Sequence, residues 1–394
     1  MAKRLAIPSE DVELKIVGPY DSLAIPRVQR VTVNKDVPST DIYELGNNQL
    51  AGVVTDIPNV TLTFSVFDVG IKAFATMTGT DPDAYPGAGV DISELQEVDA
   101  IVYIKSDTAT DFAKSAHAKR LQVRDFSFSY SVDGESTEDY TVVGSQVKWF
   151  LYDVIVDRFT TGTTSFNLTQ TPLVLSNGDY ALSAILDGAY LTEVTGAPST
   201  GEYRIVGTTL TTGDSRTEQL MVVYHANPAG NNWSYISDSS MPAAVRGKSV
   251  KVQIVANDIP RVQNVTINGN LNVQPVREMG NPSIVGYQRQ VPTVDGTLAV
   301  LDTDTELLDL LLNGSYPSGA TEFEFGVECV ASGVGLDILI YDPCDDATLL
   351  KTVSIPELIL TGDSYASTVN QNATHTFNWK SNTAQCIVYS GAAA

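Results

Sequence analysis

Basic residues are scarce in this chain of 394 residues. It has 24 Lys and Arg against 47 Asp and Glu, which gives a formal net charge of −23 and a pI near 4.3. The acidity is spread evenly, with −9 over residues 1–150 (13 basic, 22 acidic), −6 over 151–245 (3 and 9) and −8 over 246–394 (8 and 16). Because binding to nucleic acid or anionic membranes depends on clustered Lys and Arg, the composition argues against a protein that grips either.

Long apolar runs are also missing. No run approaches the roughly 18 residues that a membrane helix requires. The basic start, MAKRLAIPSEDVELK, is followed by carboxylates rather than by the apolar core of a signal peptide. The sequence therefore predicts a soluble protein that is made in the cytoplasm and does not insert into membranes.

Cysteine and histidine are rare as well. Cys329, Cys344 and Cys386 are an odd number in a long chain, which implies no closed disulfide framework. We interpret them as small buried residues, with a pair between Cys329 and either Cys344 or Cys386 as the alternative. The three histidines, His117, His225 and His375, show no spacing typical of a metal site.

Signatures of catalysis are absent too. The chain has no G-x-S-x-G motif and no cysteine beside a plausible base. The acidic run DTDTE, residues 302–306, lacks the glycine and the terminal glutamate spacing of a calcium loop, and capping of a following helix explains it better. We therefore predict no enzyme, no cofactor and no metal site. Three tryptophans could stack on sugars or bases, but we favour buried anchors of β-sheets: Trp149, Trp233 and Trp379.

What the chain does have is an internal repeat. AIPRVQRVTVN, residues 24–34, returns as DIPRVQNVTIN, residues 258–268. The offset between Pro26 and Pro260 is 234 residues (260 minus 26), and it holds without a gap as far as Asp68 and Asp302. Identical pairs along it are Arg27/Arg261, Gln29/Gln263, Asn34/Asn268, Glu44/Glu278, Gly46/Gly280, Asn47/Asn281, Gly52/Gly286, Pro58/Pro292, Val60/Val294 and Thr63/Thr297.

Weaker similarity extends the repeat on both sides. DVELKIV (11–17) corresponds to SVKVQIV (249–255), VDAIVYI (98–104) to LDILIYD (336–342), and SVDGEST (131–137) to TVNQNAT (368–374). A tandem duplication explains these matches. We therefore divide the chain into repeat 1 (residues 1–150), an insert (151–245) and repeat 2 (246–394).

Both repeats predict a mainly β fold. Runs such as VTLTFSV and FSFSYSV alternate apolar and polar residues between clusters of Gly, Pro, Asn and Asp, a pattern typical of half-buried antiparallel strands. One helix is expected in each repeat, at DVGIKAFATMTG (68–79) and at DTELLDLLLNG (304–314), where Leu307, Leu308, Leu311 and Leu312 share a face. Each repeat is thus predicted to be a β-sandwich or half-barrel with one helix. The insert predicts a small β module with turns at Asn177-Gly178 and Asp187-Gly188.

The repeated block RVQ.VTVN…ELG…G…D.PNVTLTF.V.D.G resembles the tail tube, or major tail, proteins of long-tailed double-stranded DNA viruses. The resemblance covers residues 27–70 and 261–303 well, and the remainder of each repeat only by strand order. Repeat 2 departs from the pattern, with Asp295-Gly296 where repeat 1 has Thr61-Leu62 and Asn272 in place of Pro38.

The resemblance implies a virion protein whose strands join laterally into rings that stack into a hollow tube for viral DNA. A chain with two repeats would form trimeric rings with pseudo-sixfold walls. The implied partners are further copies of the chain, the tape measure protein in the lumen during assembly, and the tail terminator and distal tail proteins. Viral double-stranded DNA would pass without specific binding, through a negative lumen. The insert resembles, more weakly, a decoration module on the outside of a tail, and it could equally be a spacer or surface cover.

The resemblance also implies that the connections at residues 37–57 and 271–291 reach neighbouring subunits. We expect them to become ordered on assembly, with Glu44 and Glu278 paired to basic residues. The alternative explanation for the shared residues is residual similarity after duplication. The assembly residues expected from the repeat are Arg27, Gln29, Glu44, Gly46, Asn47, Gly52, Arg261, Gln263, Glu278, Gly280, Asn281 and Gly286.

Other functions stay open at this stage. A minor tail ring protein or the inner tube of a contractile injection machine would share the fold. A tandem β-sandwich adhesin or carbohydrate-binding protein is a second class, which the lack of a signal segment disfavours.

Overall fold

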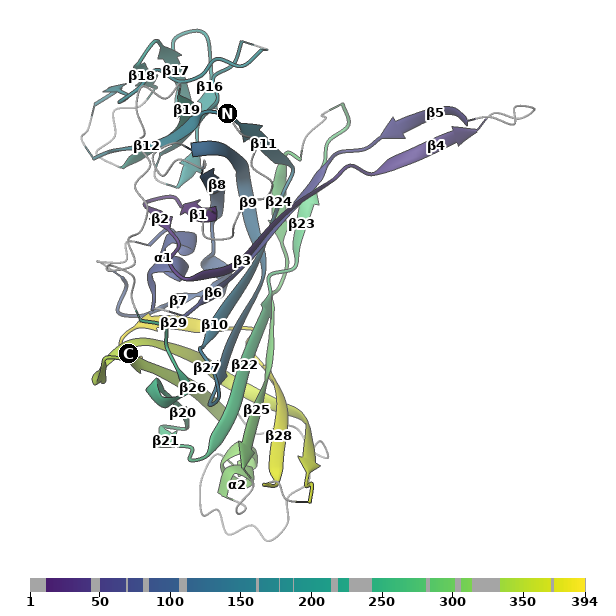
Figure 1. Ribbon diagram of the computed structural model, residues 1–394, viewed down its shortest axis with the longest axis vertical. Coiled ribbons are helices and arrows are strands. Elements are labelled where there is room, and N and C mark those ends of the chain that lie inside the picture. The colour runs from purple at the N-terminus through teal and green to yellow at the C-terminus, as the bar shows by residue number, and fades with distance from the viewer. Residues whose placement is uncertain are drawn as a thin grey trace, which may run out of the picture.

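A computed structural model describes residues 12–43, 50–68, 70–80, 85–105, 112–160, 163–176, 178–186, 188–213, 219–226, 243–280, 284–301, 306–313, 334–369 and 372–393. The described chain is mainly β, as predicted, and none of its sheets closes on itself. In Figure 1 the insert lies above repeat 1, repeat 2 lies below, and a thin two-stranded arm extends away from both.

Repeat 1 begins with short strands and ends with long ones. Its elements are β1 (Val12–Val17), β2 (Ser22–Ala24), β3 (Val28–Asp36), β4 (Ser39–Tyr43), β5 (Leu50–Thr55), β6 (Asn59–Phe67), α1 (Lys72–Thr78), β7 (Val90–Asp91), the 3₁₀ turn η3 (Ile92–Glu94), β8 (Glu97–Lys105), β9 (Phe112–Ser131), β10 (Thr137–Gly144) and β11 (Gln146–Phe150).

Repeat 2 follows the same succession in its described elements, except that none corresponds to β7 or η3 and that a 3₁₀ turn precedes the first strand. Its elements are the 3₁₀ turn η5 (Gly247–Ser249), β20 (Val250–Ile254), β21 (Asn257–Asp258), β22 (Val262–Asn270), β23 (Val273–Val276), β24 (Gly286–Arg289), β25 (Thr293–Leu301), α2 (Glu306–Asn313), β26 (Val334–Asp342), β27 (Asp345–Ala366), β28 (Thr374–Ser381) and β29 (Ile387–Ser390). Both predicted helices are therefore present.

Strand pairing is the same in the two repeats. Repeat 1 is ordered β2-β1-β8-β9-β10-β6-β3 and repeat 2 is ordered β21-β20-β26-β27-β28-β25-β22, with β11 beside β9 and β29 beside β27. Three register shifts recur at equivalent positions, in β3/β6 and β22/β25, in β8/β9 and β26/β27, and in β9/β10 and β27/β28. The two segments thus share not only a strand order but also its irregularities.

The long strands β9 and β27 each pass from one layer of the fold to the other within a single continuous sheet. The first half of β9 pairs with β8 and β11, and its second half pairs with β10. Apolar residues alternate inward, as in β6, where Val60, Leu62, Phe64 and Val66 are buried. One continuous hydrophobic core, formed between the layers, includes buried residues from both repeats.

The insert is a small two-layered β module. One sheet contains β12 (Asp153–Phe159), β19 (Leu220–Ala226), β14 (Leu182–Leu186) and β15 (Ala189–Tyr190). The other contains β13 (Ser165–Asn167), β18 (Thr209–Thr212), β17 (Glu202–Val206) and β16 (Thr192–Glu193). The insert has a hydrophobic core of its own between these sheets.

Two expectations on single residues need correction. Cys386 is buried, but Cys344 is exposed beside a turn, where Asp342 accepts a hydrogen bond from its backbone N–H. Trp379 is buried, whereas Trp149 is 55% exposed on β11. Alternation predicts which strand residues face inward only where another layer covers that face, and β11 lacks such a cover at Trp149. Cys329 and Trp233 lie outside the described residues.

Candidate functional site

The two repeats are joined by strand pairing. The second half of β9 pairs with β10 on one side and with β22 of repeat 2 on the other, in an antiparallel register from Asn264 opposite Ser131 to Asn270 opposite Asp125. This inner junction produces an uninterrupted sheet of eight strands, β3-β6-β10-β9-β22-β25-β28-β27 (Figure 1).

A buried charge cluster crosses the inner junction. Lys351 of β27 contacts the carboxylates of Asp68 (Nζ–Oδ2 2.6 Å) and Glu138, and all three side chains are buried. Tyr130 donates a hydrogen bond to Asp68, and Tyr140 donates one to Glu138. Burial lowers the pKa of Lys351, but the two carboxylates outweigh burial and hold it above the usual value. The lysine therefore stays charged and links repeat 2 to repeat 1.

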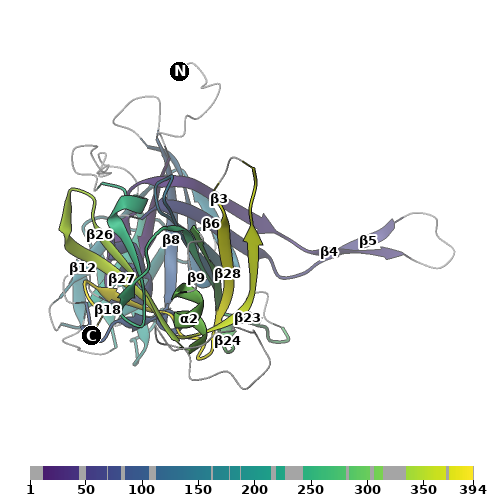
Figure 2. The same cartoon turned by 90° about the horizontal axis from the view of Figure 1, so that it is seen from below.

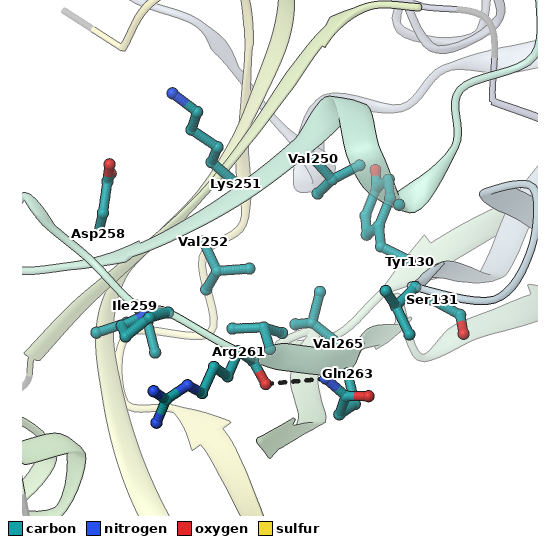
Figure 3. Close-up of a pocket in the computed structure, with 14 residues that line it drawn as sticks. Tyr130, Ser131, Val250, Lys251, Val252, Asp258, Ile259, Arg261, Gln263 and Val265 are labelled. Carbon is teal, nitrogen blue, oxygen red and sulfur yellow. Dashed lines mark hydrogen bonds between the residues drawn. The ribbon is translucent and has the colours of Figure 1, made fainter. Parts of the chain in front are cut away.

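The repeated PRVQ motif lines a cavity of about 490 Å³ at one end of this junction. In Figure 3, residues of β20 and β22 surround the cavity together with the end of β9. Arg261 has a φ of 62°, and its carbonyl accepts hydrogen bonds from Leu301 N (3.1 Å) and Gln263 Nε2 (3.1 Å). The Gln263 carbonyl accepts a hydrogen bond from Val132 N of repeat 1 (3.0 Å).

Repeat 1 builds the same turn. Arg27 has a φ of 57°, and its carbonyl accepts hydrogen bonds from Phe67 N (3.2 Å) and Gln29 Nε2 (3.1 Å). The turn precedes the shared register shift between the two strands. The glutamine of the motif thus has a local reason to recur, because its side chain satisfies the carbonyl of a left-handed residue.

Two strand edges are open at the ends of the eight-stranded sheet. Among the described residues, β3 pairs only with β6, and the second half of β27 pairs only with β28. These are the counterparts of β22 and β9, the strands that pair at the inner junction. Exposure follows this difference: Phe128 on β9 is 1% exposed, whereas its counterpart Tyr365 on β27 is 59% exposed.

The hairpin arms of the two repeats also differ in whether they have partners within the chain. The described parts of both form antiparallel hairpins, β4–β5 in repeat 1 and β23–β24 in repeat 2. The repeat 2 arm lies on repeat 1: Arg289 donates to the Gln122 side chain (2.7 Å) and to the Ser93 carbonyl (2.7 Å), and Arg277 pairs with Asp56 (3.0 Å). This arm therefore has partners within its own chain, contrary to the expectation that both arms wait for a neighbour.

The repeat 1 arm extends into solvent, as both views show (Figures 1 and 2). Ile42, Tyr43, Val53 and Val54 are all more than two-fifths exposed on it. A thin hairpin with apolar side chains has no cover of its own, and a two-stranded hairpin is only marginally stable alone.

The remaining expected assembly residues fall on these arms. Gly52 lies opposite Ile42 in the β4–β5 hairpin, and Gly286 lies opposite Val276 in β23–β24. Glu278 is exposed between β23 and β24, near Gly280, which has a φ of 84°. Glu44, Gly46, Asn47 and Asn281 lie outside the described residues.

A histidine pair that sequence spacing missed holds the insert on repeat 1. His117 of β9 lies with Nε2 2.9 Å from Asp99 Oδ2 and Nδ1 2.9 Å from Nε2 of His225, on β19 of the insert. Tyr190 donates a hydrogen bond to Asp99 (2.6 Å), and the Phe150 ring stacks on His225 with centroids 3.5 Å apart. Separation of 108 residues along the chain left no local signal for this contact.

The histidine pair is set up to be neutral. Burial lowers the pKa of His117, against the raising effect of Asp99, and burial followed by repulsion from His117 lowers the pKa of His225 to about 2. With a neutral His117 that donates to Asp99, Nδ1 accepts the hydrogen bond from His225. A further proton would place two N–H groups face to face in a buried site.

The described part of the chain contains no group of three His, Cys, Asp or Glu side chains that could hold a metal ion. The same residues include no helix long and apolar enough to cross a membrane. No protein-family model and no curated protein matches the chain.

Proposed function

We propose that the protein is a structural subunit of a viral tail tube, in which further copies of the chain continue the eight-stranded sheet laterally. The observation that carries the proposal is that the open edges β3 and β27 are the counterparts of the two strands already paired at the inner junction. Such head-to-tail contacts build rings when the rotation closes and filaments when it does not. Ring closure removes both edges, which otherwise invite uncontrolled pairing.

Three chains would place six tube domains around a ring. This number comes from the sequence resemblance, in which single-repeat relatives form sixfold rings and a chain with two tandem tube domains supplies two positions. The repeat 1 arm, which points away from its own chain, would reach an adjacent subunit or ring. The insert sits on the side of repeat 1 away from the eight-stranded sheet, which suits an outer position on the tube.

The outward face of the eight-stranded sheet suits a conduit for DNA. Register and alternation place mostly Ser, Thr and Asn on it, including Thr32, Thr63, Ser127, Asn268 and Asn378. The acidic residues of this face are Asp36, Asp125, Asp139 and Asp295; its basic residues are Arg30 and Lys380, and the nearby Arg124 pairs with Asp125. Affinity for DNA comes largely from Lys and Arg that neutralise phosphates, so this wall would let DNA pass.

Electron microscopy of the purified full-length protein tests the proposal. We expect rings or tubes with three chains per ring, the insert on the outside, and no measurable binding of duplex DNA at ordinary salt. Monomers at every concentration and ionic strength would contradict the proposal. A whole-chain sixfold ring, or an insert inside the lumen, would contradict the proposed arrangement of the chain.

A surface variant tests the arm separately. Replacing Tyr43 and Val54 by serine should leave the fold intact and prevent tube growth, because it removes apolar contacts with a neighbour. The matched control replaces Val174 and Val206 of the insert, which are similarly exposed. Tubes of normal length from the arm variant would exclude the arm from assembly.

A further inference from the structure

The inner junction is a template for a contact that the single chain cannot make. Residues of β22 correspond to residues of β3 at an offset of 234, as in the repeated motif. Residues of β27 correspond to residues of β9 at an offset of 237, because Ala366 pairs with Thr374 as Ser129 pairs with Thr137. A shared register shift confirms that offset. Between β9 and β10 it follows Thr141, and between β27 and β28 it occurs at the equivalent residue, Asn378.

Carrying the inner pairing over to the open edges defines one register. Ile267 lies opposite Phe128, and Gly269 lies opposite Phe126. Subtracting 234 from the first member and adding 237 to the second converts these pairs into Val33 opposite Tyr365 and Lys35 opposite Asp363. We infer that a second copy of the chain docks its β3 edge on the β27 edge in this register, with Lys35 of one copy paired to Asp363 of the other. The inference rests on the proposed function.

The side chains at these positions support a contact of this kind. At the inner junction, Gly269 must be glycine, because a Cβ there would lie 1.9 Å from the Phe126 ring. At the outer edges, Lys35 takes the place of Gly269 and Asp363 takes the place of Phe126. A steric fit between a glycine and an aromatic ring is thus replaced by opposite charges, which favour directly opposed positions in antiparallel strands.

The charges of Lys35 and Asp363 also disfavour pairing between two β3 edges or between two β27 edges. Two β3 edges paired with their Lys35 residues opposed would bring lysines together, and two β27 edges paired at Asp363 would bring aspartates together. Like charges across an antiparallel pair are destabilising. Asp363 also holds His375 (2.7 Å), which orients the carboxylate at the edge. The pair would therefore select the head-to-tail contact over either self-contact.

Other exposed side chains flank the same seam. At the inner junction, Val388 of β29 is buried and pairs with Val90 of β7. Its counterpart on β11 of repeat 1 is Trp149, because each lies opposite equivalent residues of the neighbouring strand. Trp149 is 55% exposed, with Lys114 4.9 Å over its ring. Lys114 is itself the counterpart of Lys351, so the incoming copy would bring an apolar residue and a cation to the seam, as repeat 2 does inside the chain.

Cysteine crosslinking tests the register. In a chain with Cys329 and Cys344 replaced by serine, we combine Val33→Cys with Tyr365→Cys and oxidise the protein under assembly conditions. Directly opposed residues lie about 4.5 to 5.5 Å apart between Cα atoms, within reach of a disulfide. We expect covalent oligomers that end at the trimer, and none from either single variant. Val31→Cys with Tyr365→Cys, two residues out of register, should crosslink at least tenfold less.

Charge exchange tests the ion pair. Lys35→Glu and Asp363→Lys should each raise the concentration needed for assembly at least tenfold, and the double variant should restore assembly toward the level of the unaltered chain. Lys251→Glu, at an exposed position of β20 away from both edges, serves as the control and should change little.

The outcomes separate this inference from the proposed function. Rings that form without the disulfide, or charge variants whose exchange restores nothing, would overturn the register while the tube function stands. Failure of the unaltered chain to form rings or tubes would overturn both. Crosslinking by the out-of-register pair as strongly as by the predicted pair would also overturn the register.

Discussion

Leu62 in repeat 1 and Gly296 in repeat 2 occupy the same place on equivalent strands, and their cross-strand neighbours differ in the opposite sense. Leu62 lies opposite Val142, whereas Gly296 lies opposite Trp379. A Cβ on Gly296 would meet the Trp379 ring at 2.4 Å. Two medium-sized side chains, Leu62 and Val142, thus correspond to a glycine and a tryptophan in repeat 2. The two repeats share the volume of this pair rather than the identity of its residues.

The surfaces of the two repeats diverged for a different reason. Val17, Ile101 and Tyr103 of repeat 1 form an apolar cluster with residues of the insert. Repeat 2 has Val255, which is 44% exposed, at the position of Val17. It has Asp337 at the position of Ile101, because Asp337 pairs with Ser354 as Ile101 pairs with His117, two residues away from the correspondence that the sequence match predicts. In the described part of the chain the insert therefore buries apolar area on repeat 1, whereas the equivalent surface of repeat 2 is exposed at Val255.

The largest effect is expected where a lysine is buried in one repeat and not in the other. Lys351→Ala should lower the free energy of unfolding by about 3–5 kcal/mol, because Asp68 and Glu138 would be left as buried carboxylates without a cation. The equivalent Lys114→Ala should cost far less in the unassembled chain. Chemical denaturation measures both. Equal losses from the two variants would show that the inner junction does not depend on its charge cluster.

Acid should weaken the contact between the insert and repeat 1, because this contact contains the buried pair of His117 and His225. Repeat 2 has Ser354 in place of His117 and lacks this pair. The folded pKa of His225, about 2, is below the unfolded value near 6.5, so the unfolded state binds more protons between these values and stability falls as pH falls. The expected loss is about 2.3 kcal/mol from pH 6.5 to pH 4.5, because the slope rises from half its limiting value at pH 6.5 to about 1.36 kcal/mol per pH unit at lower pH. Unfolding curves at several pH values measure it.

A matched pair of variants assigns that pH dependence. His225→Gln and His117→Gln should each reduce the loss between pH 6.5 and pH 4.5, because burial lowers the pKa of both rings. An unaltered slope in the His225 variant would place the titrating groups elsewhere.

A smaller effect is expected from the core exchange between the repeats. Gly296→Ala should lower the free energy of unfolding by about 1–3 kcal/mol, because its Cβ would lie 2.0 Å from the Thr266 carbonyl oxygen. Gly286→Ala is the control, since no atom lies within 4 Å of a Cβ there. If both variants unfold alike, close packing is not what requires glycine at position 296.

The smallest expected effect is that of salt on assembly, which weighs the Lys35–Asp363 pair against the net charge of the whole chain. Each chain carries a net charge of −23, so assembled chains repel one another, and salt screens this repulsion. We expect the concentration needed for assembly to fall severalfold between 0.1 and 1 M salt, even though salt weakens the single Lys35–Asp363 pair. Sedimentation at several salt concentrations measures it. Weaker assembly at high salt would mean that the pair outweighs the overall repulsion.

Local sequence patterns predicted much of the fold class. Alternation in VTLTFSV predicts the buried side of β6, and the leucines before Gly314 predict α2, because both signals arise from neighbouring residues. The left-handed turn at Arg27 was beyond that reasoning. Its positive φ and the hydrogen bond from Gln29 depend on the register shift between β3 and β6, which single-residue preferences do not encode.

By itself the sequence determined the duplication, its offset of 234, the mainly β character and the even negative charge, because composition and periodicity are properties of short stretches. Only the tertiary structure decided that β9 pairs with β22, that Lys351 meets Asp68, and that His117 meets His225. These partners are separated by more than one hundred residues. Their pairing is selected by burial in a common core, where an unpaired strand edge or an uncompensated charge costs more than the chain's small net stability allows.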